Sequence, residues 1–243
     1  MRICVIPMFL LAAASFVPLA PAAHAQTMFP LNPRGTYLRT NSDSPLLPLV
    51  VDLAAIGVAP GDVIRLTISG AWQFTGNPAN QSTSTLAVFS SSSTILASSQ
   101  PHRVPGAIDA GLEYVSSPTF FGGLATDIPE DFRVAALGVQ TSVTVTAPAG
   151  AAFIVICAHD SLYSDNSDPD GDYAVTIGPG CLADFNEDGT VNSTDVSDFI
   201  NAWFTDQVKG TLVAHWDHNG VVNSTDVSDF INAWFEDTAA GCG

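Results

Sequence analysis

Basic residues are scarce in this chain. Its 243 residues include 7 Lys and Arg against 24 Asp and Glu, and the formal net charge is −17. A protein that binds a phosphate backbone needs a basic surface, so the composition argues against a nucleic-acid partner. After the first 25 residues, no apolar run is long enough to span a bilayer, and we expect no membrane span.

Several catalytic and metal-binding signatures are also missing. The sequence has no Cys/His spacing typical of zinc sites and no G-x-S-x-G elbow. Between residues 26 and 179 the only glutamates are Glu113 and Glu130. Glycosidases commonly use two carboxylic acids, which Asp could also supply. A small polysaccharide-degrading hydrolase therefore stays an alternative to a binding function, and we name no catalytic residue.

The N-terminus has the features of an export signal. Met1-Arg2 precedes an apolar stretch from Ile3 to Ala22, and Ala23-His24-Ala25 matches a signal-peptidase site. We expect residues 1–25 to be a signal peptide, which leaves 243 − 25 = 218 residues and a secreted, extracellular or cell-surface protein. An uncleaved membrane anchor is the alternative, although three prolines interrupt the apolar run.

The strongest signal is an internal repeat. Val191–Phe204 and Val222–Phe235 both have the sequence VNSTDVSDFINAWF, offset by 31 positions. Internal repeats define architecture before any single motif is judged. Each copy begins inside a 12-residue loop rich in oxygen donors, and the repeats span residues 184–204 and 215–235.

The first loop has the donor spacing of a calcium-binding EF-hand loop. Gly189 stands at position 6, where the chain must turn sharply. Carboxylate, amide and carbonyl oxygens without sulfur favour calcium over zinc or copper. The alternative is a surface turn rich in Asn, Asp and Gly, which does not explain the repeat. The predicted ligands are Asp184, Asn186, Asp188, the Thr190 carbonyl, Asn192 and Asp195.

The second loop departs from this pattern at its first position. His215 stands where the first loop has a carboxylate, and imidazole is a poor calcium ligand. We therefore expect a weaker second site. Its predicted ligands are Asp217, Asn219, the Val221 carbonyl, Asn223 and Asp226.

A short helix is expected after each loop. Apolar residues fall at i, i+3, i+4, i+7 and i+8, as in Val196, Phe199, Ile200, Trp203 and Phe204. We expect about three turns per helix, which is marginal alone in water, so metal binding and mutual packing must hold the pair. No helix enters the first loop, and each unit is half an EF-hand.

Two such loop-helix repeats near a C-terminus resemble a type I dockerin domain. The resemblance covers residues 180–243 and implies a small all-α module that docks, with calcium, onto a cohesin module of a scaffold or cell-surface protein. It also implies two alike docking faces. The positions that match partner contacts in that family are Ser193, Thr194, Ile200, Asn201, Ser224, Thr225, Ile231 and Asn232.

The cysteines fit an exported protein. Cys181 and Cys242 bracket the two repeats, and we predict a disulfide between them. Cys157 lies in an apolar run and is expected to be an inert core thiol.

Residues 26–179 have the pattern of an antiparallel β-sandwich. Short runs rich in Val, Ile, Thr and Phe alternate with turn residues. The strands are expected over residues 47–53, 62–69, 85–90, 141–146, 152–158 and 172–177.

One loop of this domain is strongly acidic. His159–Asp172 holds five Asp and one Asn between two expected strands, and such dense oxygen donors repel one another unless a cation or solvent intervenes. The alternative is a solvated acidic turn. A second acidic cluster covers residues 127–131, and its Asp127 is a further candidate ligand.

The stretch Gly61-Asp62-Val63-Ile64 with Gly70-Ala71-Trp72, followed by this acidic loop, resembles calcium-dependent galactose-binding lectins of the PA-I type. The resemblance implies a β-sandwich in which a loop-bound calcium contacts sugar hydroxyls. Carried over, its ligands are Asp160, Asp165, Asn166 and the Thr75 carbonyl.

The sequence thus predicts a secreted calcium-binding protein that docks through its tail and displays a carbohydrate-binding sandwich. A structural surface protein, stiffened by calcium and without sugar binding, is the remaining alternative.

Overall fold

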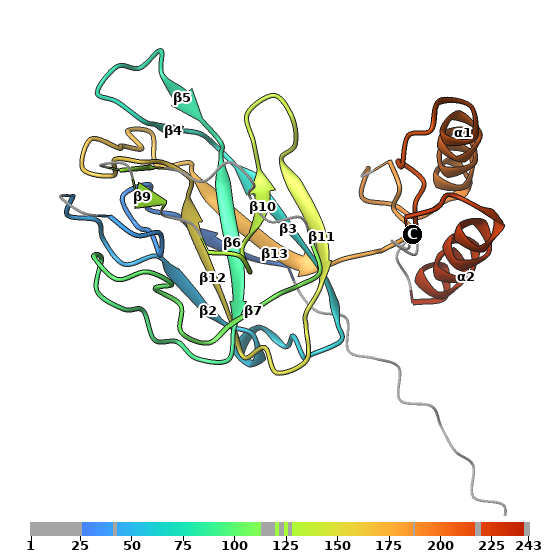
Figure 1. The fold of residues 1–243 in the computed structure, drawn as a ribbon, viewed down its shortest axis with the longest axis horizontal. Coiled ribbons are helices and arrows are strands. Elements are labelled where there is room, and N and C mark those ends of the chain that lie inside the picture. Colours follow the sequence, from blue (N-terminus) through green and yellow to red (C-terminus); the bar gives the residue numbers. More distant parts are fainter. Residues whose placement is uncertain are drawn as a thin grey trace, which may run out of the picture.

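The chain forms two main antiparallel sheets followed by a C-terminal pair of helices (Figure 1). The computed structural model describes residues 26–40, 43–112, 120–121, 124–125, 128–186, 188–216 and 220–240. The expected signal peptide lies outside these residues. Among the described helices, none combines the length and the apolar character needed to cross a membrane.

The two main sheets pack as a sandwich. The first has the strand order β1 (Thr27–Pro30), β13 (Ala174–Pro179), β3 (Val63–Ser69), β11 (Ser142–Thr146). The second has the order β10 (Phe132–Ala135), β6 (Thr85–Ser90), β12 (Phe153–Ala158), β2 (Leu49–Asp52), with β7 (Ala107–Ile108) also paired to β6. The shorter elements are a 3-10 turn η1 (Ala54–Ile56), the pair β4 (Trp72–Gln73) and β5 (Gln81–Ser82), and the pair β8 (Phe120–Phe121) and β9 (Leu124–Ala125).

Side-chain alternation explains why these segments form sheets with a shared core. Along β3, Ile64, Leu66 and Ile68 are buried and their neighbours are half-exposed, as a strand with one covered face requires. By contrast, every residue of β6 is buried, so both faces of this central strand are covered. Aromatic residues add to the core, and Phe89 stacks on Phe132 at 5.7 Å between ring centroids.

The six expected strands all form, as β2, β3, β6, β11, β12 and β13. β1 and β10 were not expected. Both are only four residues long, with the sequences TMFP and FRVA, which is too short for a recognisable strand pattern. Met28 of β1 is also 67% exposed, so its apolar character does not mark a core position. Cys157 lies buried in β12 as expected, and burial raises the pKa of its thiol to about 12.

The two helices are longer than expected. α1 (Ser193–Lys209) and α2 (Ser224–Ala240) have 17 residues each, which is nearly five turns rather than three. α1 continues past the last apolar residue of its repeat and ends at Gly210, which takes the left-handed conformation that glycine favours at a helix C-terminus. At its start, Asn192 accepts from the Thr194 N–H while Asp195 accepts from the Asn192 N–H, a reciprocal capping box.

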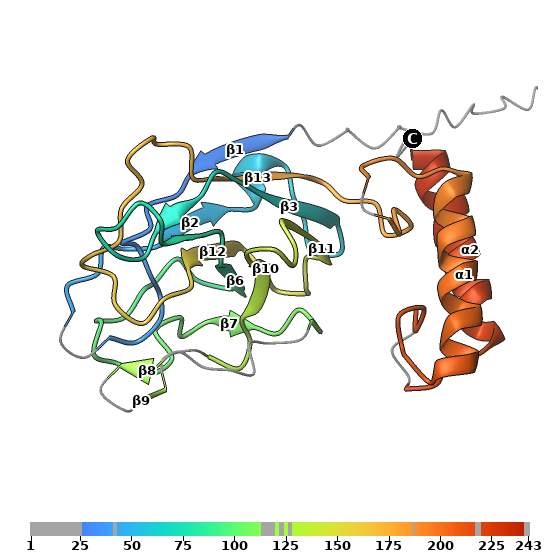
Figure 2. The same ribbon diagram turned by 90° about the horizontal axis from the view of Figure 1, so that it is seen from above.

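Stacked aromatic rings hold the helices together. Phe199 and Phe230, equivalent residues of the two repeats, are fully buried and stack at 4.1 Å with nearly parallel planes. Phe185 and Trp216, one from each loop, pack edge-on against this pair. The helices lie next to each other in Figure 1 and overlap in the view of Figure 2, and residues of both form one hydrophobic cluster.

The helical tail follows the sandwich without a free linker. β13 pairs with β3 as far as Pro179, and the Gly180 N–H donates to the Val63 carbonyl at 3.0 Å. A Cβ at Gly180 would collide with the backbone of Ile64. The first residues of the tail are therefore held against the sandwich at the N-terminal end of β3. The predicted partner of Cys181, Cys242, lies outside the described residues, so that disulfide stays a prediction.

Substitution of Gly70 tests how closely the acidic loop packs against the end of β3. It has φ of +69°, and a Cβ there would meet the backbone of Asp172; Gly138 has nearly the same φ, +71°, with open space around it. Both Gly→Ala changes should cost about 1 kcal/mol for the left-handed conformation. Gly70→Ala should cost roughly 1–3 kcal/mol more from overpacking, measured by urea denaturation. Equal losses for the two variants would contradict the close approach.

Candidate calcium loops and the acidic loop of the sandwich

In loop one, the two carboxylate oxygens of Asp184 have different surroundings. Its Oδ2 accepts from the Gly189 N–H at 3.0 Å, and this closes the loop between positions 1 and 6. Its Oδ1 is buried and has no hydrogen-bond partner among the residues that the structure describes. A buried carboxylate oxygen without a partner carries a substantial desolvation cost unless a cation meets it.

The side chains between these two ends form a chain of local turns. Asn186 Oδ1 accepts from the Asp188 N–H, and Asp188 Oδ1 accepts from the N–H and the hydroxyl of Thr190. The bonds from the Thr190 hydroxyl and amide lower the pKa of the exposed Asp188 carboxyl. These bonds favour the ionised form of the carboxylate, which a metal needs.

Asp195 closes loop one at position 12. It is fully buried, and its two oxygens accept from the N–H groups of Asn186 and Asn192. The amide of Asn192 in turn donates to the Thr190 carbonyl at 3.3 Å. Five of the predicted ligands are thus linked to one another by hydrogen bonds: Asn186, Asp188, Thr190, Asn192 and Asp195. The sixth, Asp184, is joined to the loop through the Gly189 N–H. The structure therefore brings the six predicted residues of loop one into a single closed turn.

Loop two repeats this closure with a different first residue. The Gly220 N–H donates to Nε2 of His215, as the Gly189 N–H donates to Asp184. Asp226 is fully buried and accepts from the N–H groups of Trp216 and Asn223. The amide of Asn223 donates to the Val221 carbonyl at 3.3 Å. The other two predicted ligands, Asp217 and Asn219, lie outside the described residues.

His215 thus accepts the glycine N–H as Asp184 does in loop one, but it supplies no carboxylate oxygen for a cation. A neutral imidazole nitrogen can accept the glycine N–H, so the turn still closes. The ring brings no second oxygen for a cation. Its use in the hydrogen bond is consistent with the weaker second site that the sequence predicts.

Each helix also braces the loop of the other repeat. The Trp203 indole donates to the Asn223 carbonyl, and the Trp234 indole donates to the Asn192 carbonyl, both at 2.9 Å. The two bonds are equivalent, so each loop is held by the helix that follows it and by the helix of the other repeat.

A second reciprocal pair joins the helix ends to the loop starts. Asp206 of α1 accepts from the Ala214 N–H and Asp237 of α2 accepts from the Ala183 N–H. Our sequence analysis missed these roles, as it missed those of the indoles. The signal was present, because each pair keeps the 31-residue offset of the repeat.

The residues predicted to contact a partner lie mostly on the surface. Ser193, Thr194 and Asn201 are exposed, as are their equivalents Ser224, Thr225 and Asn232. Ile200 and Ile231 are half-buried and pack against the tail core. The cap of α1 is Asn192, so the Ser193 and Thr194 hydroxyls are not needed for capping.

The sandwich holds a second group of unpaired oxygens in its acidic loop. Among the residues that the structure describes, Oδ2 of Asp160 and Oδ1 of Asn166 have no hydrogen-bond partner, and both are buried. Asn166 Nδ2 donates to the Pro33 carbonyl at 3.0 Å. Burial raises the pKa of Asp160 to about 6. The nearby Asn166 side chain lowers this pKa, and the negative charge of Asp165 raises it. The structure therefore brings these three predicted ligands together.

The remaining predicted ligands of the sandwich are less well placed. Thr75 follows β4, which an antiparallel bridge between Gln73 and Ser167 brings alongside the acidic loop. Its hydroxyl accepts from Asn77 and Asn80, and no described contact links its carbonyl to Asp160. Asp127 lies outside the described residues.

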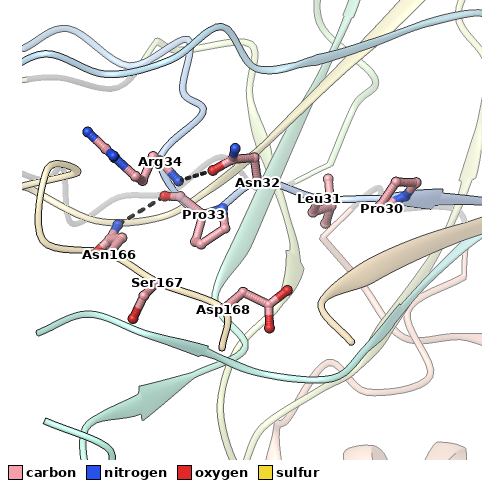
Figure 3. A pocket seen from close by; sticks show the side chains of 8 residues that line it. All are labelled: Pro30, Leu31, Asn32, Pro33, Arg34, Asn166, Ser167 and Asp168. Atoms are coloured by element: carbon pink, nitrogen blue, oxygen red, sulfur yellow. Dashed lines mark hydrogen bonds between the residues drawn. The ribbon is translucent and has the colours of Figure 1, made fainter. Parts of the chain in front are cut away.

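A pocket opens beside this loop. Figure 3 shows it between the segment after β1 and the acidic loop. Asn166 bridges the two segments through its bond to Pro33. The lining residues are Pro30, Leu31, Asn32, Pro33, Arg34, Asn166, Ser167 and Asp168.

The rest of the acidic loop makes a carboxylate triad. Ligand oxygens of Asp168, Asp170 and Asp172 lie within 4.8 Å of one another on the surface. Backbone N–H groups of Gly171 and Tyr173 donate to Asp168, so ordinary turn hydrogen bonds account for its position.

No protein-family model, curated protein or solved structure matches this chain. The functional argument therefore depends on the geometry of the loops.

The indole brace gives a test of loop coupling. Trp203→Phe keeps most of the ring packing and removes the hydrogen bond to the Asn223 carbonyl, so the free energy of unfolding of the tail should fall by about 1 kcal/mol. Phe204→Ala, at a side chain that is 61% exposed, is the control and should change it much less. Helix loss followed by circular dichroism in urea measures both. An unchanged Trp203→Phe variant would show that the brace contributes nothing.

Proposed function

We propose that the tail is a calcium-dependent docking module of a secreted protein. The observation that carries this proposal is the state of Asp184, whose Oδ2 is held by the Gly189 N–H while Oδ1 stays buried and unpaired. Calcium prefers oxygen ligands in flexible loops of this length, and the donor set of loop one contains three carboxylates. In loop one the ion would be held by Asp184, Asn186, Asp188, Thr190, Asn192 and Asp195.

Bound calcium would offset the charge that makes the tail unfavourable on its own. Residues 180–243 hold 11 acidic residues and one basic residue, Lys209. A helix pair with so small a core gains stability from any ligand that binds only the folded form. The partner proposed from the dockerin resemblance is a cohesin module, bound through the exposed Ser-Thr pairs and Asn201 and Asn232. A disulfide between Cys181 and Cys242 would clasp the two ends of this module.

Calorimetric titration of the full chain with calcium tests the docking module. We expect one tight binding phase from loop one and a weaker one from loop two, apart from any calcium bound at the acidic loop of the sandwich, which Asp160→Asn would remove. Asp184→Asn should weaken the tight phase at least about tenfold, because it removes a charged ligand. Asp109→Asn, a change at an exposed acid of the sandwich, is the charge-matched control and should leave both phases unchanged. Absence of any binding by the wild-type chain would refute the proposal.

A second function is favoured for the sandwich: calcium-dependent carbohydrate binding at the acidic loop. Its support is the pair of buried, unpaired oxygens on Asp160 and Asn166, with Asp165 nearby. A calcium ion held there could meet sugar hydroxyls from the adjoining pocket. A neutral galactoside is the ligand class that the lectin resemblance suggests.

Glycan binding with and without chelator separates this function from the first. Asp160→Asn should abolish calcium-dependent binding to galactosides immobilised on an array, since it removes a charged ligand of the sandwich site. Asp184→Asn changes only the tail and should bind sugar as the wild type does. If no glycan binds in calcium, the sandwich has no such function, and the docking proposal is unaffected.

A further inference from the structure

An ion pair joins the sandwich to the first residue of loop one. Arg65 lies on β3, and its Nη1 donates to Oδ2 of Asp184 while its Nη2 donates to Oγ of Ser142 at 3.1 Å. The Asp184 side chain is 3% exposed and that of Arg65 is 20% exposed. The pair is therefore largely removed from solvent, where a charge interaction is weakened less than on an open surface.

The surroundings of this pair are an interface between the two parts of the chain. A cleft beside Asp184 is lined from β11 and the turn before it by Gln140, Ser142, Val143 and Thr144. From the tail it is lined by Leu182, Asp184, Phe185 and Trp216. The Gly180 N–H bond to Val63 holds the start of the tail at the N-terminal end of β3. Whatever changes the charge of Asp184 therefore acts on the contact between sandwich and tail.

Calcium and Arg65 would share one carboxylate. Arg65 and the Gly189 N–H both occupy Oδ2, which leaves Oδ1 for an ion. The three predicted carboxylate ligands, Asp184, Asp188 and Asp195, together carry a formal charge of −3, and a divalent cation bound by them changes this to −3 + 2 = −1. A guanidinium is attracted more strongly to the empty loop than to the loaded one, because like charges repel through the shared carboxylate.

We propose that calcium binding at loop one and the Arg65 contact oppose each other, so that calcium loosens the tail from the sandwich. The inference depends on the proposed calcium site. Linkage makes the effect reciprocal: if calcium weakens the Arg65–Asp184 pair, then Arg65 weakens calcium binding by the same factor. Arg65 is then an internal counter-ion that stabilises the empty loop, and this contact between tail and sandwich is weaker when calcium is bound.

Calcium affinity of the full chain tests this inference. In Arg65→Gln, the tight calorimetric phase, identified by its loss in Asp184→Asn, should strengthen about fivefold. Arg65→Lys keeps the charge and should stay close to wild type. Arg133→Gln removes an equal charge from an exposed arginine of β10 and should leave the affinity unchanged, which separates the contact from the general charge of the protein.

The other outcomes are distinct. Equal affinities for wild type and Arg65→Gln would overturn the inference while leaving the calcium site intact. Weaker binding in Arg65→Gln would also overturn it, because Arg65 would then orient Asp184 for the ion. Absence of calcium binding by the wild type would instead refute the site itself. Should Arg65→Gln fold poorly, Ser142→Ala removes a partner that holds the guanidinium, and its tight phase should strengthen in the same direction.

Discussion

The tail depends on a buried carboxylate at the start of each helix. Asp195 and Asp226 are fully buried, and each accepts N–H groups from the loop that precedes its helix. A short helix with few core residues is marginal alone, so this closure joins helix formation to loop formation. Because each carboxylate is negative and buried, these N–H groups at the start of the helix also stabilise its charge. The stacked Phe199–Phe230 pair then joins the two closed units into one small core.

The two repeats differ most at the first position of the loop. Asp184 and His215 accept the same glycine N–H, so the backbone of both loops closes in the same way. Asp184 has a second carboxylate oxygen that could bind a cation, which the imidazole of His215 lacks. Asp184 also forms an ion pair with Arg65 of the sandwich. Loop one therefore combines the better donor set with a link to the other part of the chain. In this account it senses the cation, and loop two mainly supports the helix pair.

Local spacing made much of this structure predictable. A 12-residue loop sets its own hydrogen bonds, so the residues that close loop one could be named from sequence, while their role as calcium ligands stays a proposal. Strands such as β6 and β12 follow from short β-branched runs. The lengths of α1 and α2 could not be predicted from the apolar stripe, because polar residues carry α1 on to Gly210. The Arg65–Asp184 pair could not be predicted either. Its partners are 119 residues apart, and only the pairing of β3 with β13 brings the start of the tail to Arg65.

Nuclear magnetic resonance of the full chain tests the central claim most directly, because it follows each loop separately during a calcium titration. The amide signals of Gly189 and Gly220 report the two hydrogen bonds that close the loops. An ion bound in a loop changes the electrostatic surroundings of its glycine N–H and therefore shifts that signal. The account predicts that the Gly189 signal moves at low calcium and that the Gly220 signal moves only at higher calcium. A Gly189 signal that stays in place as calcium rises, with the helices already formed, would contradict the claim that loop one is a calcium site.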